Sequence, residues 1–107
     1  MTLTDDRFSA AVLNLYLQLP ETPSRVYPYD RKRAIDLENQ HIPLAVIESA
    51  FLLASLRRLV RSPDMPPLNP IRSLAYFGPV IQEVLANPLS EDYVQYLRRK
   101  VAALSGR

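Results

Sequence analysis

The segment from Leu44 to Arg61, LAVIESAFLLASLRRLVR, constrains the fold of this chain more than any other. Its apolar side chains surround nearly the whole circumference of a helix, and little besides Glu48, Ser55 and Arg58 interrupts them. A helix on the surface of a globular protein keeps one wide polar face. The segment therefore predicts a central helix that packs against its neighbours on at least two sides.

Other helices are predicted around this segment from apolar periodicity. The ten prolines fall almost entirely at the expected helix starts and in connectors, and no alternating strand pattern occurs. We therefore expect an all-α fold, a compact bundle of about five helices around the central apolar helix, with proline-rich connectors. A single domain accommodates all 107 residues. The expected helices cover residues 5–19, 31–40, 44–61, 70–86 with a kink at Gly78-Pro79, and 91–104.

Residues that favour helix N-caps precede four of these helices. They are Thr4, Asp30, Asn69 and Ser90. The segment before the second helix, residues 21–29, contains two prolines and is expected to be an extended connector. Between the second and third helices, Ile42 precedes a proline and so avoids helical angles, which predicts a tight turn there.

Several classes of function lack their characteristic residues. Cysteine is absent and the single histidine, His41, lies in the predicted turn, so no metal site is recognisable. With two glycines and no GxGxxG or Walker sequence, a phosphate-binding loop is not expected. The acidic N-terminus does not read as a secretion signal, and the longest apolar run is too short to span a bilayer. We therefore expect no cofactor, no metal, no membrane insertion, no enzymatic activity and a cytoplasmic location.

The basic residues divide into two groups by their place on the expected helices. A net charge of +2 permits a nucleic-acid partner without demanding one. The first group offsets the negative pole at helix C-termini and is interpreted as structural: Arg57, Arg58, Arg61, Arg98, Arg99 and Lys100. The second group occupies expected first turns, where each cation is disfavoured by about 0.3 to 1 kcal/mol. It consists of Arg31, Lys32, Arg33 and Arg72. A local cost of this kind favours use in binding an external anion.

Two tyrosines lie just before the basic triplet, in the order Arg25, Tyr27, Tyr29. Phosphate contacts from cations, together with base stacking on tyrosine, hold single strands without reading their sequence, at about 1 to 3 kcal/mol per stacked base. An alternative has equal support. In it both tyrosines pack on the core and the triplet pairs with Asp30, Asp36 or Glu38.

The helix-turn-helix order of residues 31–61 does not predict reading of the DNA major groove. The candidate recognition helix is too apolar to lie in a groove, no glycine marks the turn, and Leu37 stands where a small residue is expected.

Two stretches carry a resemblance to a known family. Residues 43–50, PLAVIESA, and residues 73–81, SLAYFGPVI, are together similar to the helical domain of bacterial DnaD-like primosomal and phage replication proteins. Tyr76, Val80 and Ile81 match the order Tyr-x-x-x-Ile/Val-Ile/Leu of that family. The tryptophan that usually follows is absent, and Gly78-Pro79 interrupts the helix. The resemblance spans residues 30–85 and implies DNA binding in replication initiation or helicase loading, with Tyr76 and nearby basic residues close to the nucleic acid.

The sequence thus predicts a non-enzymatic accessory DNA-binding domain of replication or mobile-element machinery that contacts phosphates and stacks on bases. The predicted DNA-binding residues are Arg25, Tyr27, Tyr29, Arg31, Lys32, Arg33, Arg72 and Tyr76. The alternative is a helical protein-protein interaction adaptor without nucleic-acid binding. Its proline-rich connectors and exposed apolar side chains, such as Met65 and Leu68, would dock a protein partner.

Overall fold

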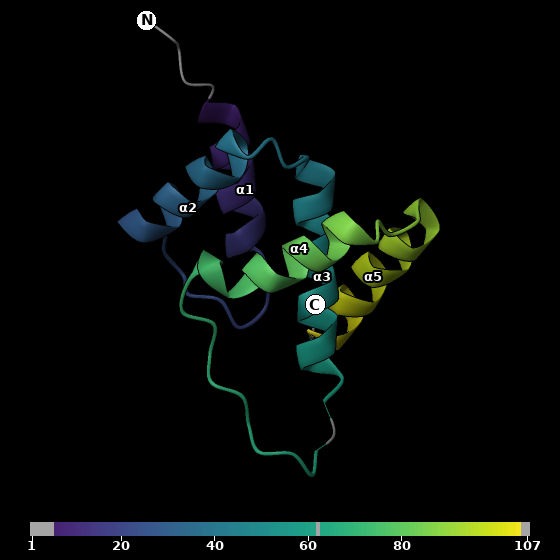
Figure 1. Ribbon diagram of the computed structural model, residues 1–107. Helices are drawn as coiled ribbons and strands as arrows, with labels where there is room; N and C mark the ends of the chain where they lie inside the picture. Colours follow the sequence, from purple (N-terminus) through teal and green to yellow (C-terminus); the bar gives the residue numbers. More distant parts are fainter. Residues whose placement is uncertain (1–5, 62, 106–107) are drawn as a thin grey trace, which may run out of the picture.

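The computed structural model describes residues 6–61 and 63–105, and all regular structure in these ranges is helical (Figure 1). The elements are α1 (Asp6–Leu17), α2 (Pro28–Asn39), α3 (Leu44–Leu59), a 3-10 turn η1 (Leu74–Phe77), α4 (Gly78–Ala86) and α5 (Glu91–Leu104). The predicted all-α bundle is confirmed. No helix among the described residues is both long and apolar enough to cross a membrane.

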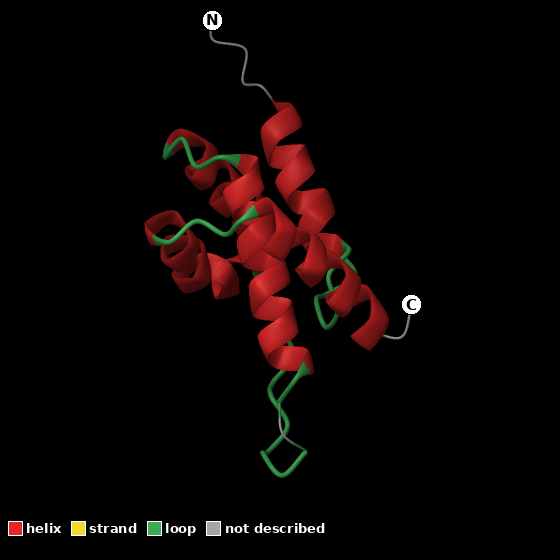
Figure 2. Ribbon diagram, turned by 90° about the vertical axis from the view of Figure 1, so that its right-hand side faces the viewer, coloured by secondary structure: helices red, strands yellow, loops and turns green. Residues whose placement is uncertain are grey.

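Helix α3 is the centre of the bundle, as its sequence predicts. It packs against α1, η1, α4 and α5, which lie around it in both views (Figures 1 and 2). Every residue from Ser49 to Ser55 is buried. Helix α2 packs mainly on α1 and η1, so its outer side faces away from the bundle.

An aromatic cluster links α3 to the helices on either side of it. The fully buried Phe77 ring of η1 lies 4.8 Å from Phe51 of α3 and 6.1 Å from Tyr16 of α1, measured between ring centroids. The Tyr16 contact is edge-to-face, a geometry that aromatic rings favour. This cluster fixes η1, and with it the start of α4, against the core.

Helix α2 begins at Pro28, not at Arg31, and Asp30 is not its N-cap. Proline fits the first position of a helix, because that position needs no amide donor. Asp30 is the third helical residue, and its Oδ2 atom accepts a hydrogen bond from the amide of the N-cap residue Tyr27 at 3.0 Å. The cap is therefore supplied from inside the helix.

The predicted helical start at Asn69 and Pro70 is also wrong. Residues 70–73 are extended, and the helical turn begins at Leu74. The extended backbone is fixed by other contacts, because the Ile71 amide donates to the Glu21 carbonyl at 3.2 Å and the Ile71 side chain is buried. Helix α4 follows η1 directly at Gly78, so the predicted interruption of this helix is confirmed.

The remaining boundaries lie close to the predicted ones. The Ser90 hydroxyl accepts from the Tyr93 amide at 3.2 Å and caps α5 as predicted. The predicted turn before α3 contains His41 at a positive φ of 58°. Helices α1 and α3 end at Leu17 and Leu59, slightly before the expected ends. The predicted cap Thr4 lies outside the described residues.

Two connectors meet on the same side of the molecule. The α1–α2 connector, expected to be extended, folds into turns around Glu21, whose φ is 66°. The α3–η1 connector projects beyond the helices and then returns toward the α1–α2 connector (Figures 1 and 2). The hydrogen bond between Ile71 and Glu21 joins the two.

Candidate nucleic-acid interface

An aromatic stack marks the start of α2. The Tyr27 and Tyr29 rings lie nearly parallel, 8° apart in plane and 5.3 Å apart between centroids. The guanidinium carbon of Arg25 lies 4.9 Å from the Tyr27 centroid, within cation–π range. The Tyr29 side chain is 54% exposed. The structure thus brings three of the predicted residues together and leaves an aromatic surface open to solvent.

The basic triplet that follows does not share one face. Residues in a helix are 100° apart, so Arg31 and Arg33 point about 200° from one another. Arg31 lies beside Ala10 and Leu13 of α1, whereas Arg33 lies beside Leu74 of η1 and Gln82 of α4. Lys32 is exposed between them. Arg31 and Arg33 therefore lie on different sides of α2, and the DNA-binding role of Arg31 stays a prediction.

The premise drawn from the helix dipole also changes. Because α2 begins at Pro28, the triplet occupies the second turn of the helix, beyond the first turn where the dipole acts. Arg72 lies outside the helical turns, directly before Ser73, the N-cap of η1. Neither position carries the cost that the sequence interpretation assigned to it.

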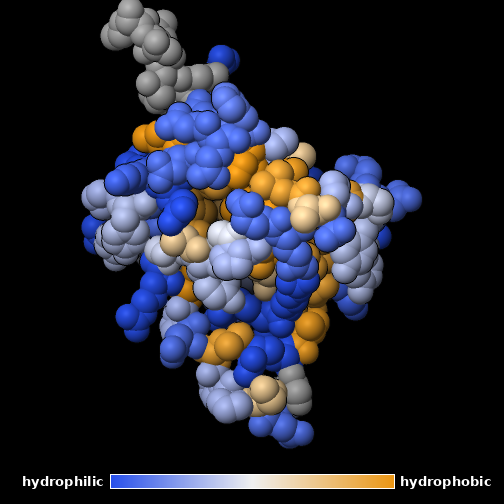
Figure 3. Space-filling model, viewed as in Figure 1, coloured by the Kyte–Doolittle hydropathy of each residue, from blue (hydrophilic) through white to orange (hydrophobic). Residues whose placement is uncertain are grey.

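Within the part of the chain that the structure describes, these cations nevertheless have no carboxylate partner. The ion pairs among residues 6–61 and 63–105 do not include Arg25, Arg31, Lys32, Arg33 or Arg72. Asp30, the nearest carboxylate in sequence, is fully buried and uses its oxygens to accept from the Tyr27 and Leu74 amides. The alternative in which Asp30 pairs with the triplet is excluded. In the view of Figure 3, hydrophilic side chains cover α2.

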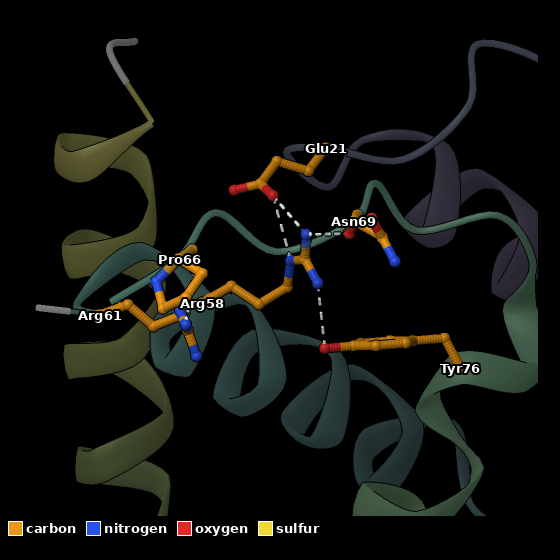
Figure 4. A network of polar contacts seen from close by, with 6 residues as sticks. All are labelled: Glu21, Arg58, Arg61, Pro66, Asn69 and Tyr76. Atoms are coloured by element: carbon orange, nitrogen blue, oxygen red, sulfur yellow. Dashed lines mark hydrogen bonds and ion pairs between the residues drawn. The ribbon is translucent and has the colours of Figure 1, made fainter. Parts of the chain in front are cut away.

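Tyr76 of η1 contacts Arg58 of α3 (Figure 4). Its hydroxyl accepts from Arg58 Nη1 at 3.2 Å, and the guanidinium lies 5.4 Å from its ring centroid. Arg58 Nε also donates to Glu21 Oε1 at 3.1 Å, and its Nη2 donates to the Asn69 carbonyl at 2.8 Å. Burial lowers the pKa of Arg58, but the hydrogen bonds with Tyr76 and Glu21 outweigh it and raise the pKa overall. Tyr76 is therefore placed by a structural arginine.

Two more arginines of the structural group are engaged by carboxylates. Arg57 forms a bidentate pair with Glu83 of α4, at 2.9 and 2.6 Å, which raises the pKa of Arg57 and lowers that of Glu83. Arg98 of α5 holds Glu48 of α3 at 3.2 and 2.9 Å. Arg57 and Arg58 lie in the last turn of α3 as predicted, whereas the last turn of α5 contains no basic residue, so Arg98 acts through its ion pair and not through a helix pole. The partners are distant in sequence, so sequence reasoning did not identify them.

A second candidate feature is a hollow of about 310 Å³ between α1, α3 and α5. Apolar side chains such as Leu19, Phe51 and Val101 line it, and the Glu48–Arg98 pair lies at its wall. Glu48 and Arg98 pair with each other, so the hollow offers few unpaired polar groups to orient a ligand. Over the described residues, no three His, Cys, Asp or Glu side chains gather where they could hold a metal ion.

No family model, no curated protein and no solved structure matches this chain. The similarity of residues 43–50 and 73–81 to DnaD-like proteins therefore stays a prediction from the sequence.

Proposed function

We propose that this chain is a non-enzymatic DNA-binding domain that holds single-stranded DNA without reading its sequence. The observation that carries the proposal is the exposed stack of Tyr29 on Tyr27 beside cations that form no ion pair with the described residues. Every base has an aromatic face, so an exposed tyrosine ring stacks on any of them. The DnaD-like resemblance supports a place in replication or mobile-element machinery in the cytoplasm.

The geometry favours different roles in DNA binding for the predicted residues. A base stacks on the exposed ring of Tyr29, while Tyr27 and Arg25 support that ring from within the stack. Lys32 and Arg33, exposed on α2, contact the adjacent phosphates. Arg31 and Tyr76 are left out of this surface, because one lies against α1 and the other is held by Arg58.

Fluorescence anisotropy with a labelled single-stranded oligonucleotide at low salt tests this proposal. Replacing Tyr29 by Ala removes the stacking surface, and a loss of 1 to 3 kcal/mol corresponds to about 5- to 150-fold weaker binding. The matched control is Tyr93→Ala on α5, because Tyr93 also stacks on a neighbouring tyrosine, Tyr96, with 5.8 Å between ring centroids. That control should bind as tightly as the wild type.

Two results would overturn the proposal. One is the absence of binding to single strands at low salt. The other is an equal loss of affinity in Tyr29→Ala and Tyr93→Ala, which would remove the α2 stack as the site.

A further inference from the structure

The α3–η1 connector contains a short proline-rich segment that is exposed to solvent. Residues 66–72, Pro-Pro-Leu-Asn-Pro-Ile-Arg, form no helix or turn, and residues 66–70 are all exposed. Proline fixes its own φ near −65°, and a residue before proline avoids the helical region. Three prolines in this stretch therefore favour the polyproline II conformation, which repeats every three residues.

The contacts of this segment follow that three-residue period. The side chain of Ile71 is buried, and that of Leu68, three residues earlier, lines a hollow with Tyr76 and Val80. One edge of the segment is thereby turned toward the protein body. Pro67 and Pro70, also three residues apart, are exposed. With three residues per turn, they share an edge that differs from that of Leu68 and Ile71.

Two arginines of α3 hold the same segment through its backbone, as Figure 4 shows. Arg61 Nη2 donates to the Pro66 carbonyl and Arg58 Nη2 donates to the Asn69 carbonyl, both at 2.8 Å. The acceptors are again three residues apart. The segment is therefore held in place before any partner arrives, which lowers the entropy lost on binding.

A cation follows the second outward proline at a fixed distance. Arg72 lies two residues after Pro70, is exposed, and takes part in none of the ion pairs among the described residues. Domains that read polyproline II bind its prolines in aromatic-lined grooves. An arginine beside the prolines fixes the direction in which the segment binds such a groove, because a guanidinium pairs with carboxylates in a fixed geometry.

We propose that residues 66–72 are a docking ligand for a partner domain with an aromatic-lined groove that ends in a carboxylate pocket. Pro67 and Pro70 occupy the groove and Arg72 pairs with the carboxylates. This inference does not depend on DNA binding, because it uses neither the tyrosine stack nor the exposed cations of α2. It reassigns Arg72 from the predicted DNA contacts to a protein partner.

The test is a titration of the full ¹⁵N-labelled chain with purified SH3 domains that carry an acidic pocket and take P-x-x-P-x-R peptides. We expect amide shifts confined to residues 66–72 and their immediate neighbours. Arg72→Ala should weaken binding about tenfold or more, because it removes charge-assisted hydrogen bonds. Arg31→Ala is the matched control, since it removes an exposed cation elsewhere and should leave the affinity unchanged.

A second variant separates the prolines from the charge. Pro67→Ala with Pro70→Ala should weaken binding to the same domains while circular dichroism stays unchanged, because both side chains are exposed. Tyr29→Ala should bind them as the wild type does, which separates this proposal from the proposed function. No amide shift with any of these domains, or equal affinity of the wild type, Arg72→Ala and the proline variant, would overturn the inference.

Discussion

The carboxylate of Asp30 joins two segments that lie 44 residues apart, because its Oδ1 atom accepts a hydrogen bond from the Leu74 amide at 2.9 Å. Its Oδ2 atom accepts a hydrogen bond from the Tyr27 amide, and this bond caps α2. One buried side chain therefore caps the start of α2 and fixes the first residue of η1.

Replacing Asp30 should destabilise the fold strongly. Asp30→Ala leaves two amides without a partner, at about 1 to 3 kcal/mol each, so we expect a loss of about 2 to 6 kcal/mol in unfolding free energy. Asp36→Asn is the control on the same helix, and it should change stability by less than about 0.5 kcal/mol. Urea unfolding monitored by circular dichroism measures both, and similar losses in the two variants would contradict this role of Asp30.

Neighbouring arginines in α3 should differ sharply in their effect on stability. The Arg58 side chain is 5% exposed and bonds to three separate segments, so we expect Arg58→Met to lower the unfolding free energy by about 2 to 4 kcal/mol. Arg57→Met breaks an exposed pair and should lower it by no more than about 1 kcal/mol. Chemical denaturation of the two variants side by side checks this contrast. A larger effect for Arg57 would show that burial does not govern these pairs.

Removing the hydroxyl of Tyr16 and removing that of Tyr76 should have different effects on the unfolding free energy. The buried Oη of Tyr16 has no hydrogen-bond partner among the described residues, so Tyr16→Phe should leave stability unchanged or raise it by about 1 kcal/mol. The hydroxyl of Tyr76 accepts from Arg58, so Tyr76→Phe should lower stability by about 0.5 to 1.5 kcal/mol. Thermal and urea unfolding provide the measurement, and a loss in Tyr16→Phe would indicate a partner for that hydroxyl.

Alkaline pH should weaken the fold through Tyr16. Burial first, and then the nearby carboxylate of Asp30, raise the pKa of Tyr16 above its ordinary value of 10.0. The unfolded chain therefore loses this proton first, so the stability contribution is complete below pH 10 and falls as the pH rises beyond it. The slope reaches about 1.4 kcal/mol per pH unit. Subtracting the unfolding free energies of Tyr16→Phe from those of the wild type at about pH 9 and pH 11 isolates this effect. A difference that does not change with pH would contradict it.

DNA affinity should fall only moderately as the salt concentration rises, because the protein neutralises few phosphates. For a single strand, the slope of log affinity against log salt concentration becomes more negative by about 0.7 for each neutralised phosphate. Two or three cations from Arg25, Lys32 and Arg33 therefore give a slope of about −1.4 to −2.1. Lys32→Ala should reduce the slope by about 0.7, whereas Lys100→Ala on α5 should leave it unchanged. Anisotropy titrations at several salt concentrations measure these slopes, and identical changes in the two variants would argue against α2 as the phosphate-binding surface.

Much of the fold could be predicted because its signals are local. The continuous apolar surface of α3 and the cap at Ser90 depend on residues within one helix, and both predictions were confirmed. The starts of α2 and η1 could not be placed, because the role of Asp30 depends on Leu74 and that of Asn69 depends on Arg58. In each case the residue expected as the N-cap makes a long-range hydrogen bond instead, through the Asp30 carboxylate to Leu74 or through the Asn69 carbonyl to Arg58.

The same limit applies to the candidate site. Tyr27 and Tyr29 lie two residues apart across a proline, and their closeness could be anticipated from that spacing. The divergence of Arg31 from Arg33 follows from helical geometry once the triplet is placed in α2. The contact between Arg58 and Tyr76 could not be foreseen. Arg58 lies in α3, Tyr76 in η1 and Glu21 in the α1–α2 connector, and these elements meet only in the folded chain.

The projecting α3–η1 connector has a consequence for how the protein tolerates being cut. Residues 63–70 are exposed, whereas the contacts that α3 makes with α4 and α5 lie within the bundle. Proteolytic cleavage between Asp64 and Met65 should yield two fragments, one carrying α1 to α3 and the other carrying η1 to α5, that remain associated and migrate together under native conditions. The same site offers new chain ends for a circularly permuted version of the protein.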